Sequence, residues 1–132
     1  MTWTLAILGR PATKGSTVSF AGKGGRIITR TDSARLVPWT DAVRWACREQ
    51  GVQVVPKDEG VSIRILVSVP TPKRRTTHYP VTRPDVDKWA RAALDALTGM
   101  AYVDDSQVVE LTIGKVYGDE WRTSIHIMTE AP

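Results

Sequence analysis

Alternation of apolar and polar residues predicts most of the strands of this chain. The segment Thr2–Ile7 alternates in this way and is expected to form a first strand. Residues 61–69 place valine or isoleucine at every second position, so one side of that strand is expected to face a core. Residues 107–117 and 122–129 also have strand character, and the glycine-containing turn between them favours an antiparallel pair.

A helical spacing of apolar residues appears in two other segments. Over residues 38–50 the side chains of Trp39, Val43 and Cys47 fall on one face, and Gly51 is a suitable residue to end the helix. This pattern is typical of an amphipathic helix that covers a sheet.

The second helix is expected over residues 87–98. Asp87 is a suitable N-cap residue, because its carboxylate can accept a hydrogen bond from a first-turn amide, and Gly99 is expected to end the helix. Before the first helix, two short β-like pieces, Thr17–Phe20 and Arg26–Thr29, flank a glycine-rich turn and indicate a hairpin. This hairpin is either a flap that contacts nucleic acid or only a flexible turn.

The predicted order is therefore strand, hairpin, helix, strand, helix, strand, strand. This order indicates an α+β fold, of the wider α/β type, with a single small mixed sheet and two helices packed on it. At 132 residues, without repeats or a long linker, the chain is expected to form a single domain over residues 1–132.

The charge of the chain favours a polyanionic partner. The net charge is +4, and basic residues gather in two segments, 14–35 and 73–91. A single cysteine, Cys47, excludes an intrachain disulfide and a cysteine-rich zinc site. The sequence has no apolar run long enough to cross a membrane and does not start like a signal peptide, so we expect no membrane partner and a cytoplasmic location.

Two pairs of aspartates stand at the two ends of the second predicted helix. Asp85 and Asp87 are two residues apart, so they face the same side of an extended segment, whereas the adjacent Asp104 and Asp105 would point apart. Carboxylates that a fold brings together in a basic protein indicate a site for Mg²⁺, which prefers oxygen ligands. Asp105 is the expected ligand of the second pair. Each pair alone is also compatible with a helix cap or a solvated turn.

Arg91 lies on the same polar stripe of the helix as Asp87 and Asp95. One interpretation is an ordinary surface ion pair. The other is a contact with the phosphate of a nucleic acid at the bond to be cut, for which the planar guanidinium is well suited.

The block RPDVDKWARAALDALTG, followed by DDSQVV, resembles the signature of the RusA family of Holliday-junction resolvases. The resemblance implies that Asp85, Asp87 and Asp105 bind the catalytic metal and that Asp104 is an auxiliary aspartate. Arg91 occupies the place of a functional lysine in that pattern, and Lys88 the place of an asparagine. Arginine keeps the positive charge of the lysine but does not readily release a proton.

The resemblance further implies a homodimer that makes paired, symmetric nicks in a four-way DNA junction, with Mg²⁺ or Mn²⁺ as cofactor. The expected DNA contacts are the basic side chains of the loops and of the helix start: Lys14, Lys23, Arg26, Arg30, Lys73, Arg74, Arg75, Arg83 and Lys88. Two alternatives stay open at this point. One is a broader nuclease that cuts flaps and forks, and the other is an inert module that binds junctions without cutting.

Overall fold

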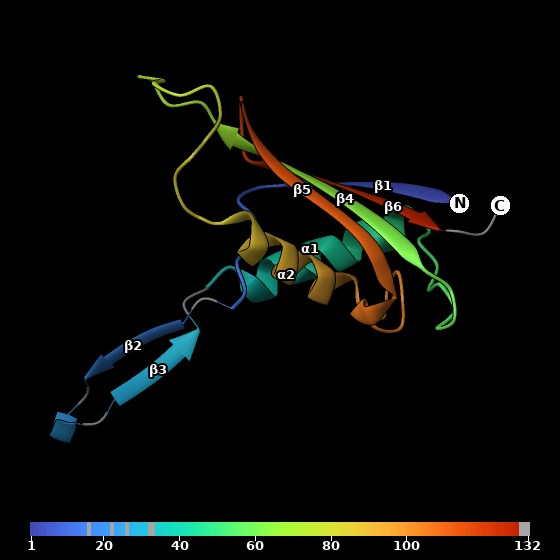
Figure 1. The fold of residues 1–132 in the computed structure, drawn as a ribbon, viewed down its shortest axis with the longest axis horizontal. Coiled ribbons are helices and arrows are strands. Elements are labelled where there is room, and N and C mark those ends of the chain that lie inside the picture. Colours follow the sequence, from blue (N-terminus) through green and yellow to red (C-terminus); the bar gives the residue numbers. More distant parts are fainter. Residues whose placement is uncertain (16, 22, 26, 32–33, 130–132) are drawn as a thin grey trace.

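Helices and strands follow one another in the predicted order (Figure 1). The computed structural model describes residues 1–15, 17–21, 23–25, 27–31 and 34–129. The bounds of its elements are β1 Thr2–Leu8, β2 Thr17–Ala21, η1 Lys23–Gly25, β3 Ile27–Thr31, α1 Leu36–Glu49, β4 Val61–Pro70, α2 Val86–Leu97, η2 Asp105–Gln107, β5 Val108–Gly118 and β6 Arg122–Thr129. The predicted α+β class is confirmed.

One mixed sheet of four strands forms the body of the protein. Its strand order is β1-β6-β4-β5, and β6 runs antiparallel to both of its neighbours. Strands β4 and β5 are parallel, so α2, which connects them, completes a β-α-β unit. The hairpin β2–β3 forms a second sheet and extends away from the body (Figure 1).

The expected antiparallel pairing of β5 with β6 is wrong, because β4 lies between these two strands. Val61, Ile63, Ile65 and Val67 of β4 are all buried, which suits a central strand with a hydrogen-bonded neighbour on each side. The connection from β5 to β6 therefore crosses the end of β4, where the amide and hydroxyl of Thr71 both donate to the carbonyl of Gly118.

Both helices cover the same face of the sheet (Figure 1). The alternation predicted for β4 is confirmed, and its inward side chains meet the apolar faces of α1 and α2 in one core. The largest fully buried side chains are Trp89, Tyr102, Leu5, Ile63, Leu97, Ile125 and Ile127. In the part of the chain that the structure describes, no helix is long and apolar enough to cross a membrane.

Helix α2 begins one residue before the predicted start. Its N-cap is Asp85, whose backbone is extended, with φ −74° and ψ 144°, and Asp87 lies inside the first turn. The expectation that Asp87 is the N-cap residue is therefore wrong. The amide of Lys88 donates to the backbone carbonyl of Asp85, while the Asp85 carboxylate makes no capping hydrogen bond. Asp85 thus ends the extended segment and leaves its carboxylate unused by the helix.

The buried hydroxyl of Thr123 generates a prediction about stability. Thr123 is 1% exposed, faces Ile7 and Val67 on the neighbouring strands, and its Oγ1 has no hydrogen-bond partner. We expect Thr123→Val to raise the free energy of unfolding by about 1 kcal/mol, because a buried hydroxyl without a partner is destabilising. Urea unfolding would measure this change.

Thr112→Val is the matched control, because it makes the same chemical change at an exposed position of β5. It should change the free energy of unfolding by less than about 0.5 kcal/mol. A loss of stability in Thr123→Val would show that the hydroxyl makes a favourable interaction in solution.

Candidate active site between α2 and β5

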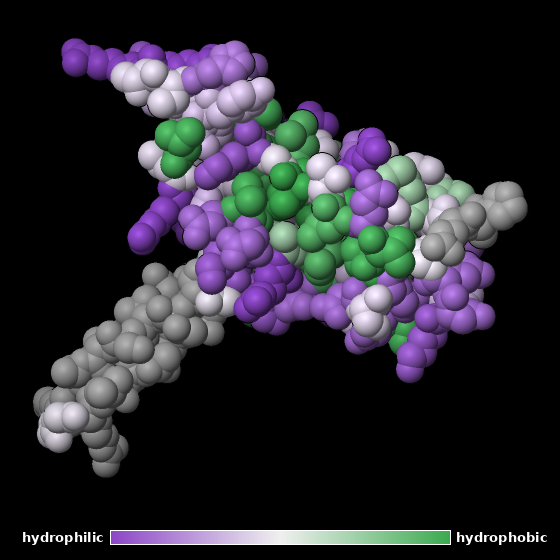
Figure 2. Space-filling model, in the orientation of Figure 1, coloured by the Kyte–Doolittle hydropathy of each residue, from purple (hydrophilic) through white to green (hydrophobic). Residues whose placement is uncertain are grey.

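A pocket of about 380 Å³ lies between α2 and β5. Four polar side chains and five apolar ones line it: Asp87, Arg91, Asp95, Asp105, Val86, Ala90, Leu94, Leu111 and Ile113. In the same region, Figure 2 shows hydrophobic side chains gathered over the middle of the body, with hydrophilic side chains around them. The pocket thus combines an apolar lining with three carboxylates and one guanidinium.

Helix α2 directs three of the four polar side chains into the pocket. Asp87, Arg91 and Asp95 are spaced by four residues, so they form one stripe along the helix. The other side of α2 is buried against the sheet through Trp89 and a set of alanines. Burial of that apolar side fixes the rotation of the helix and places the polar stripe beside β5.

The fourth polar side chain, Asp105, comes from the turn η2 just before β5. Gln107 holds this turn in place, since its side chain is buried and all its hydrogen-bonding groups face the protein. Its Oε1 accepts from the amides of Val103 and Asp104 at 2.8 and 3.0 Å. Its Nε2 donates to the carbonyls of Val55, Pro56 and Glu59 at 3.2, 2.8 and 3.1 Å.

The two adjacent aspartates of this turn have different surroundings. Asp104 is the N-cap of η2, and its Oδ2 accepts from the amide of Ser106 at 3.0 Å. Hydrogen bonds from Ser106 lower the pKa of the Asp104 carboxyl. Asp105 lines the pocket instead. The spacing Asp104-x-x-Gln107 is that of a capping box, a signal for the structural role of Gln107 that the sequence analysis did not use.

The segment that leads into the hairpin is attached to the pocket side of α2. The amide of Lys14 donates to the carbonyl of Lys88 at 3.1 Å, and Lys88 Nζ donates to the carbonyl of Gly15 at 3.3 Å. Lys14 also forms an ion pair with Asp95. Gly15 has φ +89°, and a Cβ there would lie 2.7 Å from Nη1 of Arg91. Gly15 therefore permits the close approach of Arg91.

The predicted site residues divide into two groups. Asp87, Asp105 and Arg91 line one pocket, whereas Asp85 and Asp104 are the N-cap residues of α2 and η2 and do not line it. Among the described residues, no group of three or more acidic, histidine or cysteine side chains is placed so that it could hold a metal ion. The fold thus gathers two of the three predicted metal ligands around one pocket.

The predicted DNA contacts also differ in their surroundings. Lys73, Arg74 and Arg83 are exposed on the loop between β4 and α2. Arg75 is turned back onto its own loop, where it donates to the carbonyls of residues 77 and 78 and lies 4.9 Å from the ring centroid of Tyr117. Arg26 lies outside the described residues, and so do the side chains of Lys23 and Arg30.

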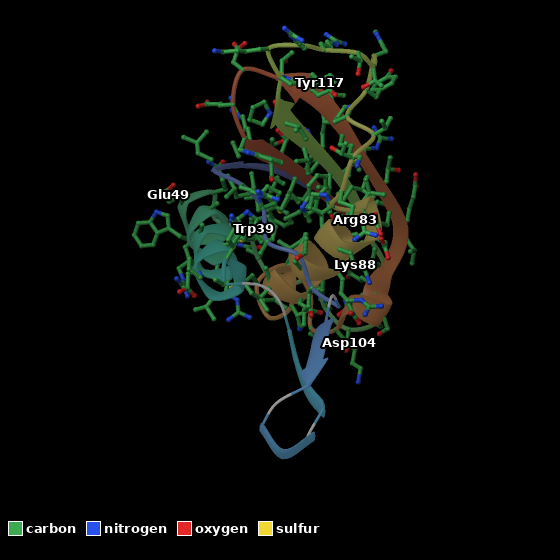
Figure 3. The ribbon with its side chains drawn as sticks, turned by 90° about the vertical axis from the view of Figure 1, so that its left-hand side faces the viewer. Trp39, Glu49, Arg83, Lys88, Asp104 and Tyr117 are labelled. Carbon is green, nitrogen blue, oxygen red and sulfur yellow. The ribbon has the colours of Figure 1, made fainter. Side chains whose placement is uncertain are left out.

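Arg83, one of the exposed cations, lies on the same side of the molecule as Lys88 and Asp104 (Figure 3). Figure 3 shows Arg83, Lys88 and Asp104 on the side away from Glu49 of α1. Carboxylates beside an arginine, in a protein with exposed basic loops, are an arrangement suited to binding and cleaving a phosphodiester backbone. The pocket and the exposed loops are therefore compatible with action on a nucleic acid.

Comparison with known proteins agrees with this indication. Residues 9–128 match the family model described as Endodeoxyribonuclease RusA, so the chain belongs to the RusA family of endodeoxyribonucleases. The chain is also similar to the Bacillus subtilis (strain 168) protein named Uncharacterized protein YqaN, with 46% identity over 48 residues. That similarity covers 36% of this chain and 34% of YqaN, about a third of the relative's length. The resemblance drawn from the aspartate block is confirmed.

The role of Gln107 generates a prediction about the turn that carries Asp105. Gln107→Leu keeps the approximate volume but leaves three carbonyls and two amides without their partner. We expect the free energy of unfolding to fall by about 3 kcal/mol, because five partly or fully buried hydrogen bonds are lost together. Chemical denaturation would measure the loss.

Glu110→Gln is a suitable control, since it changes an exposed side chain three residues further along the same chain segment. It should leave the unfolding midpoint nearly unchanged. If Gln107→Leu were as stable as the control, the hydrogen bonds of Gln107 would not be what holds the turn.

Proposed function

We propose that this protein is an endodeoxyribonuclease that resolves four-way DNA junctions by metal-assisted hydrolysis. In this proposal residues 1–132 act as one endonuclease domain, and two copies form a homodimer. One observation carries it: Asp87 and Asp105, which belong to different elements, line the same pocket as Arg91 in a chain of the RusA family. A homodimer would place two such pockets on one junction, as two symmetric nicks require.

The carboxylates of the pocket fit a hard divalent cation, Mg²⁺ or Mn²⁺. Such ions are often held by one or two carboxylates together with waters and phosphate oxygens. Asp87 and Asp105 would supply these two carboxylates. In this proposal Asp85, which makes no capping hydrogen bond and does not line the pocket in this structure, would contribute a third carboxylate once the ion and the DNA are bound. When bound, the ion would activate a water and stabilise negative charge on the phosphate.

The other residues would bind and orient the DNA. The guanidinium of Arg91 can bind the phosphate through two parallel hydrogen bonds, and it stays charged throughout the reaction. Asp104 and Gln107 would hold Asp105 in place through the turn described above. Lys73, Arg74 and Arg83 are exposed cations that would contact the backbones of the junction arms. Recognition would then depend on the shape of the junction more than on base sequence.

The proposal predicts that Asp87→Asn and Asp105→Asn abolish cleavage of a labelled synthetic four-way junction in Mg²⁺ or Mn²⁺. Each change removes a charge from the proposed metal site, while the basic loops that bind DNA stay intact. Junction affinity should therefore be unchanged or slightly higher. Gel assays of nicking and binding would measure both quantities.

Asp119→Asn is the matched control, because Asp119 is an exposed aspartate in the turn between β5 and β6. It should cut at the normal rate. Normal cutting by Asp87→Asn or Asp105→Asn would place the catalytic site elsewhere.

A second prediction concerns the charge at Arg91. Arg91→Met should slow cleavage roughly 10²-fold, as expected when one group that stabilises developing negative charge is removed. Arg91→Lys should retain most of the rate, because a cation remains near the phosphate. Single-turnover kinetics on the same junction would measure the rates, and Arg48→Met, at an exposed position of α1, is the control for loss of one positive charge.

Other branched substrates separate this proposal from its two alternatives. Cleavage of flaps and forks as fast as four-way junctions would indicate a broader structure-selective nuclease. Tight junction binding without cutting in any divalent metal would indicate an inert binding module. Paired nicks at symmetric positions in opposite arms are the result expected for a resolvase.

A further inference from the structure

Lys115, near the end of β5, extends its side chain to the segment that precedes α2. Its Nζ donates to the carbonyl of Thr82 at 2.7 Å and to the carbonyl of Pro84 at 3.0 Å. The same nitrogen lies 5.6 Å from the ring centroid of Trp89. One partly buried ammonium group thus contacts the chain on both sides of Asp85.

These contacts use most of the hydrogen-bonding capacity of the Lys115 ammonium group. It has three donors, and two of them are directed at backbone carbonyls. The ring of Trp89 offers a favourable surface for the remaining positive charge. Across the described residues the structure records one side-chain ion pair, Lys14 with Asp95, so the recorded contacts of Lys115 are with neutral groups.

The position of Lys115 relates it to the pocket. Leu111, Ile113 and Lys115 are spaced by two residues along β5, so they lie on the same side of the strand. Leu111 and Ile113 line the pocket, and Lys115 continues their row toward the start of α2. Trp89 is 2% exposed and packs edge-on against Trp121 at 6.2 Å between ring centroids, so its ring is a fixed support for the ammonium.

The segment that Lys115 contacts is the one that carries Asp85. Residues 82–84 directly precede Asp85, and the Arg83–Pro84 peptide bond is cis. Asp85 itself makes no capping hydrogen bond that would fix its carboxylate. The direction in which Asp85 faces is therefore set largely by the backbone before it, which Lys115 attaches to β5.

We infer that Lys115 is a positioning residue, which holds the backbone before Asp85 against β5 and so fixes the position of Asp85 at the start of α2. This inference rests on the proposed function only for the consequence that Asp85 binds the metal. Lys115 does not itself contact the metal or the reacting phosphate in this proposal.

The test compares Lys115→Met, Lys115→Arg and the wild-type protein. Lys115→Met keeps the length of the stem and removes the ammonium. Lys115→Arg keeps the charge and two or more donors. Arg48→Met, at an exposed position of α1, is the control for loss of one positive charge.

The first measurement is hydrogen exchange of the free protein. In Lys115→Met the backbone amides of residues 85–89 should exchange faster than in the wild type, while those of β6 should not change. Lys115→Arg should restore most of the protection. Unchanged exchange at residues 85–89 in folded Lys115→Met would overturn the inference.

The second measurement is calorimetric titration with Mn²⁺ in the absence of DNA. Lys115→Met should weaken Mn²⁺ binding roughly 10-fold, the usual size of an effect on a group that orients a metal ligand. The Mn²⁺ concentration for half-maximal cleavage should rise in parallel, with little change in the apparent affinity for the junction. Arg48→Met should match the wild type in both titrations, and wild-type Mn²⁺ affinity in Lys115→Met would overturn the consequence of the inference for metal binding.

The two proposals fail in different ways. If the wild-type protein neither bound Mn²⁺ nor cut junctions, the proposed function would be wrong, and faster exchange in Lys115→Met would still support the structural part of the inference. If Asp87→Asn and Asp105→Asn abolished cutting while Lys115→Met behaved like the wild type in every assay, the proposed function would stand and the role of Lys115 would be wrong.

Discussion

The burial of one side of helix α2 against the sheet is the constraint on which the rest of the site depends. Ala92, Ala93 and Ala96 are fully or almost fully buried, and their small side chains let the helix lie close to the strands. Trp89 fixes the first turn of the helix in the core. Because the rotation of α2 is set in this way, its polar stripe can face only the pocket beside β5. The apolar side of the helix therefore determines where the polar side chains of the pocket lie.

The number of elements and their order could be predicted from the sequence, because periodicity reports which side of each element is buried. The pairing of the strands could not. Strands that follow each other across a short turn are usually neighbours, and this favoured a β5–β6 hairpin. Instead the apolar strand β4 lies between them as a central strand of the sheet. Its pairing with β5 joins residues some 50 positions apart, which local pattern does not report.

The same holds for the candidate site: features set by neighbouring residues could be predicted from the sequence, and contacts between distant residues could not. The four aspartates were found from composition and spacing, and the separate surroundings of Asp104 and Asp105 agree with the expectation that adjacent residues point apart. The contact of Gly15 with Arg91 could not be foreseen, because it joins a loop to a helix more than 70 residues away. Nor could the sequence tell which cations bind the protein itself, as Lys14 and Arg75 do, and which are exposed to solvent, as Arg74 and Arg83 are.

The position of β1 at one end of the sheet has a consequence for how the protein is made. In the sheet, β1 pairs with β6 alone, from Thr2 opposite Met128 to Leu8 opposite Arg122. During synthesis the first strand therefore leaves the ribosome long before its partner exists, and it must wait while more than a hundred further residues are added. A fold closed by such distant contacts has a high contact order and is expected to form slowly. Until β6 is made, Leu5 and Ile7 lack the neighbouring strand beside which they become buried, so these apolar side chains stay exposed in the nascent chain.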